Sequence, residues 1–373
     1  MSGARHDRPL DAPDGPDREL LRRLPKAELH CHLDGSVRPA TLLELGAAYG
    51  KPMPAATPDA LADYMRVDDA RNLEDYLARF DITLSVMQTS EALERIAYEL
   101  AVDAAREGVR YIEVRYAPVL NVREGLSLEQ AVEAPLRGLA RAEREGGARG
   151  RVIVCGIRNM APAVSLELAE LAVAFKQQGV VGFDLAGGEE GNPATEHAAA
   201  FSYARYHDLP CTCHAGEGAG AESVRQAVHV CGAHRLGHAT RLIEDRSLMD
   251  YVIDRRITLE ICLTSNVQTR AAASIAAHPF RTYFERGANV VLNTDNRLMS
   301  GVTLTDEYER AARDLGFGFD DLARVALNGF ESAFLPLAER RALTEAAERE
   351  IAALRRGGAS AAMPATPAAG AAA

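Results

Sequence analysis

Eight short apolar runs are spaced along the chain, and longer segments with the amphipathic spacing of helices separate most of them. Several runs, such as Val109–Ala117, are apolar for most of their length, which is typical of strands buried on both faces of a parallel sheet. Alternation with helices predicts β-α-β units. We therefore expect an α/β fold, a (β/α)8 TIM-type barrel, with a doubly wound open sheet as the alternative. The predicted strands are Ala27–Leu33, Val109–Ala117, Val152–Ile157, Val180–Ala186, Pro210–His214, Arg235–His238, Ile257–Leu263 and Asn289–Thr294.

The connection after the first predicted strand, residues 34–108, is much longer than the others. Helical spacing is present at Thr41–Ala48, Leu73–Gln88 and Glu91–Glu107. Long connections usually carry structure and function, so we expect a helical insertion that caps the C-terminal mouth of the barrel. Elsewhere, amphipathic helices are predicted at Leu128–Glu145 and Leu166–Gln178.

The two ends of the chain depart from this pattern. Residues 1–21 are rich in Pro, Asp and Arg without periodicity, which predicts a disordered leader. Residues 356–373 are biased towards Ala, Gly and Pro, which predicts a disordered tail. Because no linker-like shift in composition separates them, we expect residues 22–355 to form one folded unit.

Charge and composition indicate which binding partners and which cellular compartment to expect. There are 42 basic and 53 acidic residues, a formal net charge of −11, and such an acidic surface argues against nucleic-acid binding. Neither a membrane-length apolar stretch nor the apolar core of a secretory signal is present. The six cysteines form no C-x-x-C pair, which predicts reduced thiols. We expect a cytoplasmic protein without nucleic-acid or membrane partners, and no protein partner is identifiable.

Polar side chains stand at the ends of several predicted strands. The first ends in an H-x-H pair, His30 and His32, whose side chains share one face of the strand. Alone, this pair is more consistent with two hydrogen-bonded surface histidines than with a metal site. Later strand ends carry His214, His238 and Asp295. All these ends meet at one mouth of a barrel, where three histidines and an aspartate can bind a catalytic divalent metal ion and leave a position for water.

The other six histidines are expected to be structural or at the surface. Three lie among charges on helical patterns and are predicted to be solvated, whereas one precedes a strand at the wrong end of the barrel and one is a helix-start residue. They are His6 in the leader, His197, His207 and His229 on helical patterns, His234 before a strand, and His278 before a proline.

Two short patterns mimic other sites. Residues 216–221 match G-x-G-x-x-A, but they lie late in the chain and no acidic residue follows at the spacing of a dinucleotide fingerprint. Cys211 and Cys213 have C-x-C rather than C-x-x-C spacing and no upstream H-x-E, which excludes the H-x-E class of zinc deaminases.

Six motifs occur in order: LPKAELHCHLDGS (24–36), DLAGGE (184–189), HAGEG (214–218), RLGHAT (235–240), TSNVQT (264–269) and LNTDN (292–296). Together they resemble the adenosine deaminase family of metal-dependent amidohydrolase-type barrels, over roughly residues 22–335. The resemblance implies zinc-dependent hydrolysis of adenosine, and of 2'-deoxyadenosine, to inosine and ammonia in purine salvage. The alternatives are a deaminase of another 6-aminopurine compound, such as adenine or a modified adenosine, and a non-catalytic binding barrel.

The family's catalytic roles carry over motif by motif. The resemblance makes Glu217 the proton donor to purine N1 and His238 the residue that orients the attacking water. It makes Asp295 both a metal ligand and the acceptor of the water proton. The metal ligands implied by the same motifs are His30, His32, His214 and Asp295, which would hold one Zn²⁺ per subunit.

The implied partners are a purine nucleoside and water. Among the substrate-binding residues, Asp34 resembles the residue that holds the ribose and Gly187 the backbone donor that meets the purine. His32 is implied to contact substrate as well as metal. The family's helical lid maps onto the long first connection, where Leu73, Leu77 and Phe80 are expected either to line an apolar wall or to pack in the core.

The chain departs from the family pattern at three positions. Asn296 stands where an Asp is common, at the position expected to contact purine N7. An amide donates to this acceptor without a pKa shift, whereas a carboxylate must first be protonated. Ala239 and Arg270 each stand where a Gly is common.

Overall fold

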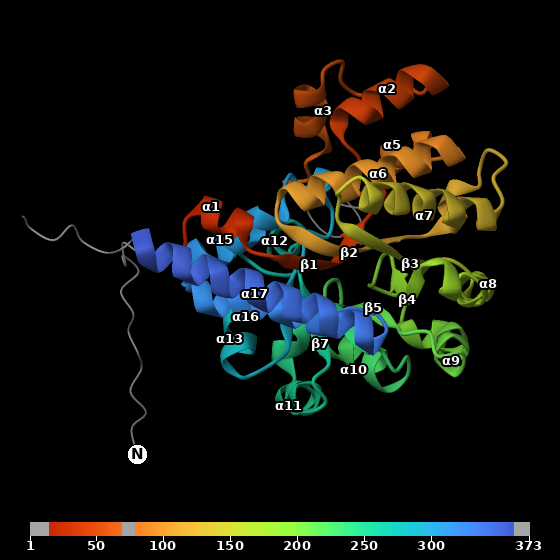
Figure 1. Cartoon of the computed structure of the whole chain (residues 1–373). Coiled ribbons are helices and arrows are strands. Elements are labelled where there is room, and N and C mark those ends of the chain that lie inside the picture. Colours follow the sequence, from red (N-terminus) through yellow and green to blue (C-terminus); the bar gives the residue numbers. More distant parts are fainter. Residues whose placement is uncertain (1–14, 69–78, 362–373) are drawn as a thin grey trace, which may run out of the picture.

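The computed structural model describes residues 15–68 and 79–361, whose path is shown in Figure 1. Within these residues, eight parallel strands alternate with helices. The strands are almost entirely buried, as expected from their apolar character. They are β1 (Lys26–His32), β2 (Val109–Tyr116), β3 (Arg149–Ile157), β4 (Val180–Ala186), β5 (Thr212–Ala215), β6 (Arg235–His238), β7 (Thr258–Ile261) and β8 (Val290–Leu292).

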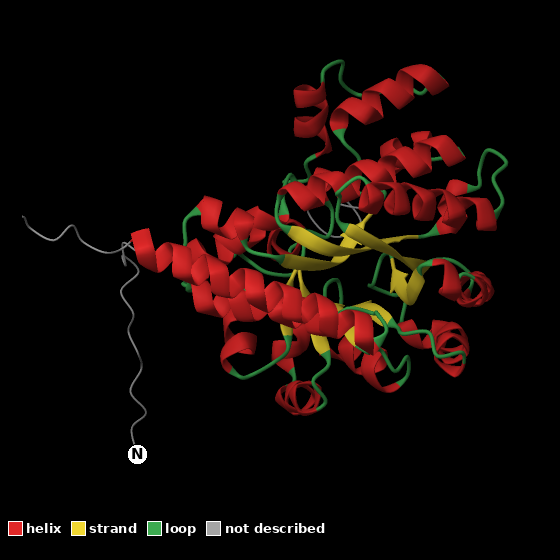
Figure 2. Ribbon diagram, in the orientation of Figure 1, coloured by secondary structure: helices red, strands yellow, loops and turns green. Residues whose placement is uncertain are grey.

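The strands form two four-stranded parallel sheets, in the orders β1-β2-β3-β4 and β5-β6-β7-β8. Isolated parallel bridges join the sheets at both edges, where Cys31 pairs with Asp295 and Phe183 pairs with Cys211. Helices surround the strands on the outside (Figure 2). This arrangement confirms the predicted (β/α)8 barrel over the open sheet.

Strands β5 and β7 are shorter than the apolar runs that predict them. Strand β5 begins at Thr212 rather than Pro210, because proline has no N–H to donate to a neighbouring strand. Strand β7 ends at Ile261, because the apolar run continues directly into helix α12 (Leu263–Gln268). Apolar residues in a helix facing the core extend the run without extending the strand.

Both predicted helices outside the insertion are present. Helix α7 (Leu128–Arg144) begins with a capping box in which Ser127 and Gln130 satisfy each other's backbone N–H. Helix α8 (Pro162–Ala174) is followed by the 3-10 turn η2 (Lys176–Gln178). Other elements are η1 (Pro118–Asn121), η3 (Ala194–His197), α9 (Ala198–Tyr206), α10 (Ala221–His229), η4 (Thr240–Glu244), α11 (Arg246–Asp254), α13 (Phe280–Glu285), α14 (Arg297–Ser300), α15 (Leu304–Leu315) and α16 (Phe319–Ser332).

The long first connection is helical. It contains α2 (Pro39–Tyr49), α3 (Pro58–Met65), α5 (Phe80–Val86) and α6 (Ser90–Arg106). Helices α2 and α3 lie beyond α5 and α6 at one end of the molecule (Figure 1). Part of the predicted segment Leu73–Gln88, including Leu73 and Leu77, falls outside the described residues.

The helical structure extends beyond both predicted boundaries of the folded unit. Helix α1 (Arg18–Arg23) begins within the predicted leader, where Asp17 caps it and Leu21 is buried. Helix α17 (Leu337–Ala361) continues into the predicted tail. All six cysteines are buried and unpaired. None of the described helices combines the length and apolar character of a membrane span.

Candidate active site and metal centre

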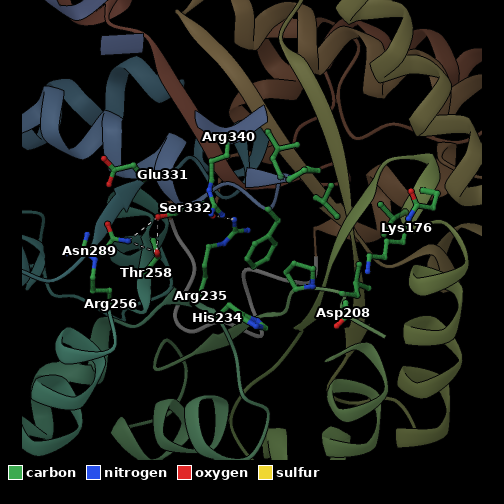
Figure 3. Close-up of a pocket in the computed structure, with 18 residues that line it drawn as sticks. Lys176, Asp208, His234, Arg235, Arg256, Thr258, Asn289, Glu331, Ser332 and Arg340 are labelled. Atoms are coloured by element: carbon green, nitrogen blue, oxygen red, sulfur yellow. Dashed lines mark hydrogen bonds between the residues drawn. The ribbon is translucent and has the colours of Figure 1, made fainter. Parts of the chain in front are cut away.

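Two cavities lie at opposite ends of the barrel. The larger, about 640 Å³, opens at the N-terminal ends of β4 to β8 (Figure 3). Its most buried charge, Arg235, is already paired with Glu113 and Glu260. The other cavity, about 280 Å³, lies at the C-terminal strand ends, where active sites of such barrels are found. All the predicted site residues except His30 line this second cavity, namely His32, Asp34, Gly187, His214, Glu217, His238, Asp295 and Asn296.

Four of the polar residues at the strand ends converge on one point. Asp295 Oδ1 lies 3.3 Å from His30 Nε2 and 3.3 Å from His32 Nε2. His32 Nε2 lies 3.1 Å from His214 Nε2. Potential ligand atoms of His30, His214, His238 and Asp295 also lie within 4.8 Å of one another. Four histidines and one aspartate therefore surround this point, whereas a metal ion bound by three histidines and an aspartate needs only four of these five side chains.

Outer carboxylates determine which imidazole nitrogens face that centre. His30 Nδ1 lies 2.9 Å from Glu260 Oε2 on β7, and His214 Nδ1 lies 3.0 Å from Asp184 Oδ2 on β4. With its proton on Nδ1, each ring turns the lone pair of Nε2 inward. Arg115 on β2 binds both carboxylates, at 2.9 Å and 2.8 Å.

Arg115 keeps those carboxylates ionised. Burial alone would raise the pKa of Asp184, but His214 and Arg115 hold that pKa well below its ordinary value. Burial also opposes ionisation of Glu260, yet Arg115 and Arg235 lower its pKa. Both carboxylates can therefore accept a proton-bearing Nδ1 at neutral pH.

The arrangement fits a bound cation. His30 Nε2 is buried without a hydrogen-bond partner among the described residues, and it faces a carboxylate oxygen. Two acceptors that face each other repel unless a positive charge lies between them. Imidazole nitrogens and a carboxylate oxygen are the donor set of catalytic zinc sites. The residues therefore fit the predicted metal.

A chain of hydrogen bonds distinguishes His238 from the other histidines. The backbone N–H of Phe280 donates to His278 Nδ1 (3.1 Å), which leaves the proton of His278 on Nε2. The Nε2–H of His278 donates to Asn266 Oδ1 (3.1 Å). The NH2 group of Asn266 therefore faces His238 and donates to its Nδ1 (2.9 Å). His238 then carries its proton on Nε2, 3.4 Å from Glu217 Oε2. A protonated nitrogen cannot bind metal, which favours His32 as the ligand in its place.

The structure corrects one expectation about the remaining histidines. His197 is buried rather than solvated, with Nδ1 2.8 Å from Ser165 Oγ and Nε2 3.1 Å from the Arg158 carbonyl. Two polar residues, Thr195 and Glu196, precede it, but its ring turns inward onto α8. His207, His229 and His234 are exposed. His278 lies two residues before helix α13 rather than at its start, and it is buried and linked to the site, which sequence reasoning missed.

Glu217 is buried at the wall of the cavity. Its Oε1 accepts a hydrogen bond from Thr269 Oγ1 at 3.0 Å. Burial, and then the nearby charge of Asp295, raise the pKa of Glu217 well above its ordinary value. This shift favours the neutral carboxylic acid, which is the form that can donate a proton to a substrate.

The predicted substrate residues surround the same space. Asp34 Oδ1 and Asn296 Oδ1 are buried without hydrogen-bond partners among the described residues, and burial raises the pKa of Asp34 to about 7. The side chain of Asn296 occupies the space next to Gly35: a Cβ on Gly35 would lie only 1.7 Å from Asn296 Oδ1. Phe80 and Leu84 of α5 also line the cavity, as the predicted lid requires.

Three of the six described non-glycine residues with a left-handed backbone lie around the cavity at the C-terminal ends of the strands. His238, Ala239 and Asp295 all have left-handed conformations, with φ of 62°, 51° and 61°. Such conformations are uncommon for residues other than Gly and cluster at functional sites. Asp295 is held in its position by Ser265 Oγ, which donates to Oδ2 at 2.6 Å.

Comparison with known proteins places this geometry in context. Residues 25–349 match the family model described as adenosine deaminase. An adenosine deaminase of Mycobacterium tuberculosis H37Rv is 43% identical, and the match covers 88% of this chain and 95% of that protein.

Solved structures are similar over the whole barrel. Adenine deaminase from Arthrobacter aurescens has a TM-score of 0.82 and 26% identity, covering 89% of this chain and 99% of its own. An amidohydrolase from Burkholderia ambifaria with bound Zn has a TM-score of 0.82 and 27% identity, covering 92% and 94%.

Proposed function

This chain belongs to the adenosine deaminase family, and on that premise we propose that the cavity at the C-terminal strand ends catalyses the hydrolysis of adenosine or 2'-deoxyadenosine to the corresponding inosine and ammonia. One observation carries the proposal. Glu217, whose burial raises its pKa, lines one small cavity together with His238, His32, His214 and Asp295, and His30 Nε2 lies 3.3 Å from Asp295 Oδ1.

We assign the metal site to His30, His32, His214 and Asp295, with one Zn²⁺ per chain. Bound there, zinc supplies the positive charge that lowers the pKa of water towards neutrality. Asp295 is suited to accept the proton that the water loses, because Ser265 holds one of its oxygens and leaves the other facing the histidines.

His238 orients the attacking oxygen by donating its Nε2–H. Burial, and then the charge of His30, lower the pKa of His238 well below its ordinary value, so the ring stays neutral. Because Asn266 donates to Nδ1, this neutral ring is a donor towards the cavity and cannot serve as the base. The base in this mechanism is therefore Asp295.

Glu217 completes the reaction. As the water oxygen bonds to C6, the C6–N1 double bond opens and N1 takes the proton of Glu217. The 6-amino group takes up the proton that Asp295 accepted from the water, and the tetrahedral carbon expels it as ammonia. The hydroxyl on C6 gives its remaining proton back to Glu217 and becomes the 6-oxo group of inosine. General acid catalysis of this kind requires the raised pKa that burial gives Glu217.

The charge of the cavity favours a nucleoside over a nucleotide. The described lining carries four carboxyl groups, whereas its only Lys or Arg side chain is Arg123, which lies 3.8 Å from Asp81. Within the described lining, no Lys or Arg side chain is therefore left without an acidic partner to bind a phosphate group. Asp34 has a buried oxygen without a hydrogen-bond partner among the described residues, so it is suited to bind ribose hydroxyls, which free adenine lacks.

The test is an ultraviolet assay of the zinc-loaded protein with adenosine, 2'-deoxyadenosine, adenine and AMP. We expect the highest kcat/KM for the two nucleosides. A preference for adenine or AMP would replace the substrate assignment but keep the chemistry. No turnover of any 6-aminopurine by protein with a full complement of zinc would refute the proposed function.

A further inference from the structure

The loop that carries Glu217 is wrapped around another buried carboxylate. Gly216 N–H donates to Glu189 Oε1 at 2.7 Å. The N–H groups of Glu217, Gly218 and Ala219 donate to Glu189 Oε2 at 2.9, 2.6 and 3.0 Å. Four successive backbone N–H groups therefore converge on one side chain.

A fifth donor reaches the same carboxylate from helix α10. Ser223 Oγ donates to Glu189 Oε1. Glu189 is only 5% exposed and forms no salt bridge within the described residues. Its negative charge is thus stabilised by backbone dipoles and a hydroxyl, in the manner of an anion bound in a nest of N–H groups.

This arrangement explains why the sequence mimics a dinucleotide fingerprint. The glycines of residues 216–221 let the backbone curl around a negative group, as they do around a pyrophosphate. Gly216 has a φ of 72°, and a Cβ there would lie 2.6 Å from a methyl group of Val224. The anion that this loop binds belongs to the chain itself.

The Glu189 carboxylate binds the backbone of Glu217, the proposed proton donor. Glu189 binds the backbone N–H of Glu217, together with those immediately before and after it. The direction in which Glu217 leaves the backbone is therefore fixed, and Thr269 fixes the far end of the side chain.

We propose that Glu189 is a positioning residue for proton donation: it holds the Glu217 loop in the one conformation that aims the carboxylic acid at the substrate. The proposal rests on the function proposed above. The competing interpretation is that Glu189 only joins the β4 and β5 connections for stability. Both interpretations predict that substituting Glu189 lowers the stability of the protein. Only the positioning role predicts a loss of kcat that depends on the presence of Glu217.

The test uses Glu189→Gln, which keeps the shape but turns one acceptor into an N–H donor facing other N–H donors. General acid catalysis is worth about 10²- to 10⁴-fold, and a misdirected acid should forfeit part of it, so we expect kcat for adenosine to fall at least about 10-fold. KM should stay within about twofold, because the acid acts mainly in the transition state. The matched control is Glu190→Gln, since Glu190 is the exposed neighbour, and its kcat should equal wild type.

A double variant separates positioning from stability. Adding Glu189→Gln to Glu217→Gln should lower kcat by less than about twofold further, because the acid that it positions is already gone. If both substitutions reduce kcat independently, or if Glu189→Gln alone leaves kcat unchanged, the inference is overturned. Should Glu189→Gln fail to fold, Ser223→Ala removes one donor and should lower kcat by a smaller factor, again only when Glu217 is present.

The same set of proteins keeps this inference distinct from the proposed function. A zinc-loaded wild type that turns over no 6-aminopurine contradicts the function. An active wild type with a fully active Glu189→Gln variant contradicts only the positioning role.

Discussion

Replacing Asn266 by Asp should reverse the tautomer of His238 at high pH. The Asn266 amide donates to His238 Nδ1 across 2.9 Å, and its oxygen accepts from His278. A carboxylate of the same shape still accepts from His278, but it can no longer donate. Neutral His238 must then place its proton on Nδ1 and turn a lone pair towards the cavity. The hydrogen bond to the attacking oxygen is lost.

The size of the effect follows from that bond. A hydrogen bond to a charged group is worth about 1.5–3 kcal/mol, or roughly 10- to 100-fold in kcat. The sign of the pH dependence also follows. A carboxylate beside Nδ1 favours the imidazolium form of His238, which again carries a proton on Nε2. Activity of Asn266→Asp should therefore recover as the pH falls and be lost as the pH rises.

The assay is kcat for adenosine between about pH 5.5 and 9, with zinc content measured at each end of the range. The matched control is Asn289→Asp, because Asn289 is also hydrogen-bonded, to Thr258 and Ser332, but lies at the opposite end of the barrel. A pH profile for Asn266→Asp that matches wild type within about twofold would refute the tautomer assignment.

Three further results are expected. Glu217→Gln should lower kcat about 10²- to 10⁴-fold with zinc retained, and wild-type activity should fall as the pH rises through the raised pKa of Glu217, which a steady-state pH profile checks. Removal of metal should abolish deamination and added Zn²⁺ should restore it; full activity of metal-free protein would contradict the metal site. If Asn296 reads N7, 7-deazaadenosine should lose about 1–3 kcal/mol of kcat/KM, and Asn296→Asp should gain a new pH dependence.

The polar residues at the strand ends could be predicted as a site from the sequence, because they interrupt the apolar pattern of the strands. Histidines and an aspartate at the ends of buried strands have few structural explanations, and the barrel gathers those ends without further information. The outer residues were readable in principle by the same signal, since Asp184 and Glu260 are charges within apolar strands. They were missed because a strand interior gives no direct indication of which neighbour a charge will meet.

Other residues depend on tertiary contacts that periodicity cannot supply. His197 follows two polar residues, Thr195 and Glu196, yet its ring is buried against the Ser165 hydroxyl of α8 and the Arg158 carbonyl. Asn266 and His278 are twelve residues apart and act together only because a helix start and a short helix pack side by side. In the sequence, Glu189 cannot be distinguished from other acidic loop residues, because only the structure shows that residues 216–219 wrap around its carboxylate.

One guanidinium links the fold to the chemistry. Arg115 is completely buried, and a buried cation is costly unless its partners are equally fixed. Its partners, Asp184 and Glu260, each orient a histidine of the proposed metal site. The barrel interior thus cannot be replaced by apolar side chains of similar size without releasing both imidazoles together. The ion network of Arg115, Asp184 and Glu260 therefore fixes the orientation of His30 and His214, in addition to any contribution to stability.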